Sequence, residues 1–142
     1  MSLDPHLRVA TGLAEFEARC EQAHLPVTSQ RRAVVETLLS RTDHPTVDDI
    51  YAVVRERGVS LATTYRALET IVALGLARRV AHTGSAVRFD PNTSAHHHFL
   101  CDACGAIADV AWKPSPIEPP AGDFDVHETS VLYRGICADC RF

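Results

Sequence analysis

The sequence predicts an α+β fold, in which a helical N-terminal domain with a two-stranded wing precedes a small C-terminal domain built from strands. Apolar residues recur at helical spacing in four segments between residues 6 and 74, alternating strands begin at residue 77, and two Cys-x-x-Cys pairs lie near the end of the chain. Residues 91–94, Pro-Asn-Thr-Ser, have the composition of a linker. We therefore expect an N-terminal domain at 1–90, a hinge at 91–95 and a C-terminal domain at 96–142.

Four helices are expected in the N-terminal domain, at residues 6–23, from Thr28 or Ser29 to Leu39 or Ser40, at 47–57 and at 61–74. Thr46 and Asp49 form a capping-box pattern for the third helix, Gly58 ends it, and Ser60 caps the fourth. The apolar positions expected in the core are Val34, Val35, Leu38, Leu39, Leu68, Ile71, Val72 and Leu74.

The third and fourth helices are joined by a short turn that contains glycine, which is the helix-turn-helix pattern of DNA-binding proteins. The residues expected near a DNA groove gather at the start of the fourth helix: Ser60, Ala62, Thr63, Tyr65 and Arg66. Two strands, 77–81 and 86–89, then form a hairpin wing around Thr83 and Gly84, on which Arg78, Arg79 and Arg88 would share a basic face. The alternative is a helical packing module with no role at DNA.

Positive charge is concentrated in the N-terminal domain. Residues 1–90 hold 11 Arg and 11 Asp+Glu, whereas residues 91–142 hold 3 Lys+Arg and 7 Asp+Glu, so the whole chain has a net charge of −4. A neutral domain with an arginine-bearing face can still contact phosphates. Arg31 and Arg32 lie in the first turn of a helix, where the helix dipole disfavours positive charge, and are candidate phosphate contacts. Solvated arginines are the alternative.

No apolar run is long enough to span a membrane, and the N-terminus has no signal-peptide core, so a cytoplasmic location is expected. In that reducing compartment, paired cysteines bind metal rather than form disulfides. The remaining cysteine, Cys20, is expected to be a packed helix residue, with a redox role as the alternative.

The paired cysteines offer four thiolates, which form a soft tetrahedral ligand set suited to structural zinc. They are Cys101, Cys104, Cys137 and Cys140. The spacing of two residues lets both sulfurs of a tight turn face one ion, and Gly105 relaxes the first turn. Disulfides or unrelated thiols are the alternatives.

Next to the first cysteine pair lies the run His96, His97 and His98. In a strand, His96 and His98 point to one face and His97 to the other. The strand 96–100 and a return strand 106–112 would form a hairpin, and Asp109 in the return strand is out of place unless it has a partner. Imidazoles with carboxylates suit iron, manganese, zinc or nickel. The alternative is a solvated histidine cluster.

These motifs, in this order, resemble the ferric uptake regulator family over nearly the whole chain. Besides the winged helix, the histidine run and the cysteine pairs, the matching motifs are Arg88-Phe89-Asp90, His44-Pro45-Thr46, Asp48 to Tyr51 and Thr63 to Leu68. The resemblance implies a homodimeric repressor of a double-stranded DNA operator, with an α/β dimerisation domain that holds a structural Zn²⁺. It places Tyr65 at the groove and implies a regulatory Fe²⁺ or Mn²⁺ site made of His44, Asp90, His96, His98 and Asp109.

Aspartate at positions 90 and 109 is similar to the peroxide-sensing branch of the family, whereas the iron-uptake branch typically has glutamate at both. The resemblance implies that hydrogen peroxide, the one small molecule expected to react, is sensed when bound iron promotes oxidation of His96 or His44. The metal would clamp the angle between the domains and so select the DNA-binding shape. The alternatives are a sensor of iron, manganese, zinc or nickel levels on the same fold, a small non-haem iron enzyme and a purely structural zinc module.

One segment departs from the family pattern. Members usually have a helix between the two groups of strands in the dimerisation domain, whereas here Pro114, Pro116, Pro119 and Pro120 exclude a helix from residues 113–123. The dimer surface is therefore expected to differ in this region.

Overall fold

The computed structural model describes residues 4–80, 86–94, 96–112, 120–126, 129 and 131–141. The chain divides into two compact units, Met1–Thr93 and Ser94–Phe142. This division lies inside the segment 91–95, whose role as a hinge stays a prediction, as do the domain limits 1–90 and 96–142.

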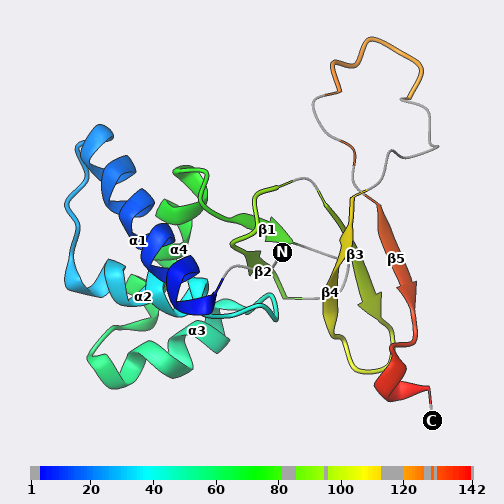
Figure 1. Ribbon diagram of the computed structural model, residues 1–142, viewed down its shortest axis with the longest axis horizontal. Helices are drawn as coiled ribbons and strands as arrows, with labels where there is room; N and C mark the ends of the chain where they lie inside the picture. The colour runs from blue at the N-terminus through cyan, green and yellow to red at the C-terminus, as the bar shows by residue number, and fades with distance from the viewer. Residues whose placement is uncertain are drawn as a thin grey trace. The chain divides into compact units, whose positions relative to one another are not determined.

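Unit 1 contains the predicted helices, followed by a hairpin (Figure 1). The helices are α1 (Pro5–Gln22), α2 (Ser29–Leu39), α3 (Val47–Val54) and α4 (Leu61–Ala73), with the 3₁₀ turn η1 (Arg55–Arg57) after α3. Each α-helix begins where a side-chain oxygen accepts from otherwise unpaired backbone N–H groups, at Asp4, Thr28, Thr46 and Ser60. Within the described residues, no helix is long and apolar enough to cross a membrane.

The third helical segment ends at Arg57 as predicted, but its last turn is not α-helical. The α-helix ends at Val54, and the chain tightens into η1, in which the N–H of Gly58 donates to the carbonyl of Arg55 at 3.1 Å. Gly58 has a φ of 80°, a left-handed conformation that glycine adopts without a steric penalty. The short turn to α4 follows directly, which gives the predicted helix-turn-helix.

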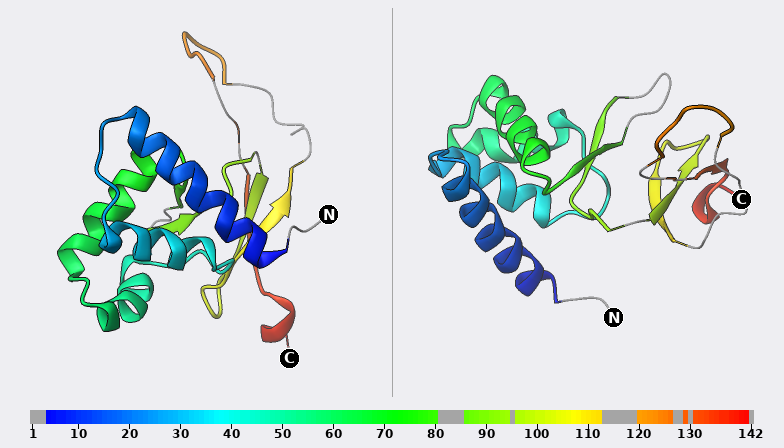
Figure 2. Two further views of the ribbon diagram at one scale, coloured as in Figure 1. Left: turned by 60° about the vertical axis from the view of Figure 1, so that its left-hand side comes forward. Right: turned by 90° about the horizontal axis from the view of Figure 1, so that it is seen from above.

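The core of unit 1 lies among its helices, with α1 packed against α2 (Figure 2). Phe16, Val34, Leu38, Ile50 and Leu68 are each at most 1% exposed. Val35 and Ile71 are also buried as predicted, whereas Leu39, Val72 and Leu74 are only partly buried and pack against the edge of this core. Cys20 belongs to the same cluster and is fully buried.

The wing is the antiparallel pair β1 (Arg78–Val80) and β2 (Arg88–Asp90). β1 lies within the predicted strand 77–81, whereas β2 begins and ends later than the predicted strand 86–89; Ala81 and the turn at Thr83 and Gly84 lie outside the described residues. The expectation of one basic face was also wrong. Arg79 is opposite Phe89 and pairs with Glu69 of α4, so it lies on the other face of the hairpin from Arg78 and Arg88.

The described residues of unit 2 form a three-stranded sheet in the order β4-β3-β5. Its elements are β3 (His96–Cys101), β4 (Ile107–Ala111), β5 (Leu132–Gly135) and the 3₁₀ turn η2 (Ala138–Cys140). The antiparallel pair β3–β4 is the predicted hairpin, whereas β5 pairs with β3 in parallel, which the sequence did not indicate. Pro114, Pro116 and Pro119 lie outside the described residues; of those described between β4 and β5, none is helical.

Candidate metal centres and nucleic-acid interface

The four paired cysteines of unit 2 form one cluster, in which the sulfur atoms lie within 4.8 Å of one another. Cys101 is the last residue of β3, Cys104 lies in the turn to β4, and Cys137 and Cys140 flank η2. The turn is closed by a hydrogen bond from the N–H of Gly105 to the carbonyl of Cys101 at 2.9 Å, with Gly105 at a φ of 75°. All five cysteines are described and none is in a disulfide. Four convergent thiols suit structural zinc.

The electrostatics of this cluster favour a cation. The N–H of Cys137 donates to the sulfur of Cys101 at 3.3 Å, and backbone donors of this kind lower the pKa of Cys101 to about 6. Hydrogen bonding with the sulfur of Cys137 instead raises the pKa of Cys140 to about 12. The thiolate form of Cys101 is thus favoured, whereas that of Cys140 is disfavoured. A divalent cation removes that conflict because it neutralises the negative charge that the sulfurs share.

The second donor group of unit 2 joins β3 to β4. Asp109 lies opposite His98 in the strand register, and its Oδ1 is 3.2 Å from Nε2 of His96 and 3.6 Å from Nε2 of His98. The two Nε2 atoms are 3.0 Å apart. The out-of-place aspartate therefore has the partners that its position in a strand suggested.

The hydrogen bonding of His96 directs its Nε2 toward His98 and Asp109. Its Nδ1 lies 2.6 Å from the carbonyl oxygen of Ser94, and because a carbonyl can only accept, Nδ1 carries the proton. In the neutral ring, Nε2 then presents a lone pair toward the Asp109 carboxylate. Two acceptors that face each other at 3.2 Å need a proton or a metal cation between them. Ser94 was not identified from the sequence, because its contribution is a backbone carbonyl.

His97 points to the opposite face of β3, as the alternation predicted. Its Nδ1 accepts a hydrogen bond from the N–H of Val131 at 3.0 Å, and its ring lies edge-on to Tyr133. The middle histidine of the run therefore links β3 to the chain entering β5.

Unit 1 holds its own pair of donors, His44 and Asp90. Nε2 of His44 lies 3.2 Å from Oδ2 of Asp90, and both side chains are at most 4% exposed. Oδ1 of Asp90 accepts from the N–H of Asn92 at 2.9 Å, which fixes the carboxylate. A buried imidazole and carboxylate suit the same divalent metals as the group on β3 and β4.

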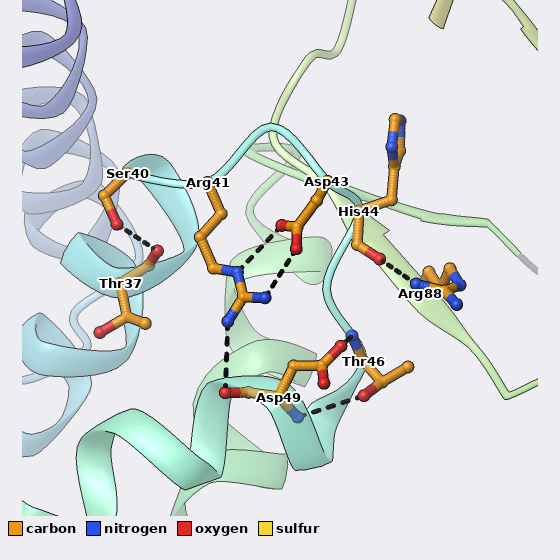
Figure 3. Close-up of polar contacts among 8 residues, drawn as sticks. All are labelled: Thr37, Ser40, Arg41, Asp43, His44, Thr46, Asp49 and Arg88. Atoms are coloured by element: carbon orange, nitrogen blue, oxygen red, sulfur yellow. Dashed lines mark hydrogen bonds and ion pairs between the residues drawn. The ribbon is translucent and has the colours of Figure 1, made fainter. Parts of the chain in front are cut away.

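The backbone around His44 is held on both sides. Arg41 donates to both carboxylate oxygens of Asp43, at 2.9 and 2.7 Å, and Arg88 donates to the carbonyl of His44 at 3.1 Å (Figure 3). The figure also shows the imidazole of His44 directed away from these contacts. This contact was not predicted from the sequence, in which Arg88 is a wing residue; the available signal was its position two residues before Asp90, which puts both side chains on one face of the strand.

The candidate DNA-contacting face lies at the start of α4. Ala62, Tyr65 and Arg66 are exposed at positions i, i+3 and i+4, and therefore lie on one side of the helix, with Tyr65 53% exposed. Ser60 and Thr63 are engaged locally, because Oγ of Ser60 accepts from the N–H of Thr63 at 3.1 Å. Thr64 is buried and anchors the opposite side.

The other arginines predicted to contact DNA have partners inside unit 1. Arg31 donates to the carbonyl of Pro26 at 2.8 Å, Arg32 forms an ion pair with Glu17, and Arg78 donates to the carbonyl of Thr93 at 2.9 Å. Their role at DNA stays a prediction.

Comparison with known proteins identifies the family. The profile of the ferric uptake regulator family matches residues 22–118. The peroxide-responsive repressor PerR of Staphylococcus aureus strain Mu50 is 34% identical over 135 residues, which cover 91% of each chain. Both findings extend over most of the residues that carry the motifs.

Solved structures share the fold. The ferric uptake regulator Fur of Helicobacter pylori, described as having three functional metal-binding sites, matches with a TM-score of 0.74, 17% identity and 94% of each chain covered. PerR of Streptococcus pyogenes, described in terms of peroxide sensing and gene regulation, matches with a TM-score of 0.54 and 23% identity over 92% of this chain and 93% of that one.

These findings confirm the α+β fold with its winged helix-turn-helix domain. They agree with the donor chemistry, since the thiol cluster suits zinc and the imidazole and carboxylate donors suit iron or manganese. Members of this family are dimeric DNA-binding proteins, so the enzyme and purely structural alternatives gain no support. The chain belongs to the ferric uptake regulator family and is a metal-responsive transcriptional regulator.

Proposed function

We propose that the protein is a repressor that binds its operator when Fe²⁺ or Mn²⁺ is bound, and that it senses hydrogen peroxide through oxidation of a histidine ligand. One regulatory ion would be held by donors from both units: His44, Asp90, His96, His98 and Asp109. The observation that carries the proposal is the position of Asp109, whose carboxylate faces Nε2 of His96 at 3.2 Å, an arrangement that a shared metal cation would stabilise.

The chemistry of the two donor groups supports one shared ion. His44 and Asp90 supply one nitrogen and one carboxylate, and β3 with β4 supply two nitrogens and one carboxylate. Neither group alone fills the coordination sphere of Fe²⁺ or Mn²⁺, whereas together they supply five side chains. These five side chains would hold the ion and would leave it accessible to peroxide.

An ion shared in this way would act as a clamp. It would favour the arrangement of the units that provides all five ligands, and its effect would be bounded by its difference in affinity between arrangements. In a dimer, that arrangement sets the distance between the two α4 helices, which must match the spacing of the DNA half-sites. The exposed side chains of Ala62, Tyr65 and Arg66 would then face the groove.

Bound Fe²⁺ would supply the redox chemistry that activates peroxide. The histidine ring gains one oxygen atom at the carbon between its nitrogens, and the second oxygen of peroxide leaves as water. The candidates for this oxidation are His96 and His44. Oxidation removes a ligand, so the clamp would weaken and the protein would leave DNA. Manganese does not carry out this reaction readily and would give a repressor that resists peroxide.

A sensor of metal levels is the second candidate. The donor set supports this candidate, because imidazoles with carboxylates bind several divalent metals and release the metal as its concentration falls. It needs the same clamp but no chemistry at the ligands.

The test loads the zinc-bound protein anaerobically with Fe²⁺ or Mn²⁺, adds a small excess of peroxide, and measures both operator affinity and the mass of each histidine peptide. The expected result is one added oxygen on His96 or His44 in the iron sample, with loss of operator affinity, and no change in the manganese sample. His97 is an internal control, since it lies in the same strand but faces the other side. Unmodified histidines with full operator affinity in the iron sample would support the metal-level sensor.

A further inference from the structure

We propose that Arg88 is a positioning residue that fixes the backbone of His44, rather than a wing arginine that contacts DNA phosphates. The inference rests on the proposed role of His44 as a metal ligand. It concerns contacts within unit 1 alone.

The backbone of His44 adopts a conformation that needs support. Its φ is 53°, in the left-handed region that residues with a side chain rarely adopt. The next residue is Pro45, which restricts the backbone of the residue before it to extended conformations in most chains. Such a conformation persists only where the surrounding structure holds it, and it is common at functional sites.

Strand β2 provides that support through three consecutive residues. Arg88 donates from Nη1 to the carbonyl of His44 at 3.1 Å, and the N–H of Phe89 donates to the carbonyl of Pro45 at 2.9 Å. Asp90 then contacts the imidazole of His44 at 3.2 Å. The first residue of β2, Arg88, thus contacts the backbone of His44, and the last residue, Asp90, contacts its ring. Arg88 supplies the contact to the carbonyl of the strained residue itself.

The segments before and after His44 are anchored separately. Arg41 binds both oxygens of Asp43 on the N-terminal side (Figure 3). On the C-terminal side, Thr46 and Asp49 form the capping box of α3, with N–H to oxygen distances of 3.0 and 3.2 Å. Because these anchors hold the loop on both sides of His44, loss of Arg88 should disturb the orientation of His44 more than it lowers the stability of unit 1.

Arg88 has two interactions at this loop: it donates to the carbonyl of His44, and its charge contributes, after that of Arg41, to lowering the pKa of the neighbouring Asp43. The guanidinium is partly buried and directed at a backbone carbonyl, whereas Arg79 on β1 of the same hairpin is exposed and pairs with Glu69. The two residues carry the same charge in one hairpin but hold different partners. Arg79 is therefore a matched control for the effect of charge loss on metal binding.

The test measures Mn²⁺ affinity without DNA, from the electron paramagnetic resonance signal of free Mn²⁺, in the zinc-loaded full-length protein. R88Q is expected to bind Mn²⁺ about tenfold to a hundredfold more weakly than the wild type, which is typical when a residue that supports a ligand is lost. R88K keeps one donor and should fall between R88Q and the wild type. R79Q should bind Mn²⁺ as the wild type does. At saturating Mn²⁺, R88Q should regain wild-type operator affinity.

Three results would overturn the proposal: wild-type Mn²⁺ affinity in R88Q, an equal loss in R79Q and R88Q, or weak operator binding by R88Q at saturating Mn²⁺. The third would identify a phosphate contact. If R88Q loses the helical circular dichroism signal, R88K replaces it, and wild-type Mn²⁺ affinity in R88K then overturns the proposal. His44→Ala separates this proposal from the proposed function. Unchanged Mn²⁺ affinity in His44→Ala would refute the metal site itself, whereas a loss in His44→Ala without one in R88Q would refute only the role of Arg88.

Discussion

Nδ1 of His97 accepts a hydrogen bond from the backbone N–H of Val131 at 3.0 Å, which ties the central strand of unit 2 to the chain entering β5. His97 is 4% exposed and its ring packs edge-on against Tyr133. The histidine run therefore combines two roles in alternation: a structural residue in the middle, and candidate ligands on either side.

His97→Ala should destabilise the protein by about 1–3 kcal/mol, because it leaves the N–H of Val131 without this acceptor and opens a cavity beside Tyr133. Thermal unfolding of the zinc-loaded protein measures the loss. The Mn²⁺ affinity of the remaining folded protein should be unchanged. His98→Ala is the matched comparison and should weaken Mn²⁺ binding instead; equal metal affinities in the two variants would contradict this division of roles.

Asp109→Asn should weaken Mn²⁺ binding by more than about tenfold, because the amide cannot supply the negative charge that faces the lone pair of His96. Asp109→Glu keeps the charge and should retain metal-dependent operator binding. Its longer side chain moves the carboxylate, so we expect lower sensitivity to peroxide, measured as oxygen incorporated into His96 and His44. Unaltered peroxide sensitivity in Asp109→Glu would favour the metal-level sensor.

Removal of zinc should unfold unit 2 and leave unit 1 folded. Among the described residues of unit 2, the buried hydrophobic side chains are Leu100, Cys101 and Ile107, too few to stabilise a sheet without a metal or another staple. Unit 1 has its own core around Phe16, Ile50 and Leu68. Chelation should therefore abolish the near-ultraviolet signal of Trp112 and keep most of the helical far-ultraviolet signal. Loss of both signals at the same chelator concentration would argue against independent units.

Cys20 should resist alkylation, and its reactivity should rise with pH. Burial raises the pKa of its thiol, with the charge of Arg31 acting in the opposite direction. Because the folded pKa lies above the unfolded one, the neutral thiol stabilises the fold below the unfolded pKa, and this contribution is lost as the pH rises through the folded pKa.

The measurement is iodoacetamide labelling between pH 7 and 10, read by peptide mass. Labelling of Cys20 should stay slow after zinc is chelated, when the other four cysteines become reactive. Rapid labelling of Cys20 at pH 7 in the folded protein would contradict the burial argument and reopen its redox role.

Local patterns in the sequence were sufficient for the helix caps and for the alternation of the histidine run, whereas His44 and Asp90 entered the donor set only through the family resemblance. The capping box of Thr46 and Asp49 and the cap at Ser60 consist of hydrogen bonds between residues three positions apart. Their formation therefore does not depend on the rest of the fold. The alternation of His96, His97 and His98 likewise follows from strand geometry alone. These features could be predicted because the interacting atoms are close in sequence.

Features that depend on distant segments could not be predicted in this way. The parallel pairing of β3 with β5 joins residues more than thirty positions apart, such as His98 and Leu132, and no local pattern specifies it. The contact of Arg88 with the carbonyl of His44 depends on the left-handed backbone of His44, which a residue before proline seldom adopts. From the sequence alone, an arginine in a hairpin is predicted to be an exposed surface charge, because its long-range partner is not known.

The parallel pairing of β3 and β5 also bears on protein engineering. Parallel neighbours require a long crossover, and here the ends of both strands are secured nearby by the cysteine cluster, where the N–H of Cys137 reaches the sulfur of Cys101. Bound zinc would close this loop whatever its length, and the entropy of loop closure grows only slowly with added residues. The connection between β4 and β5 is therefore a position where an affinity tag or a fluorescent reporter should be accommodated without disturbing the pairing of β3 with β5.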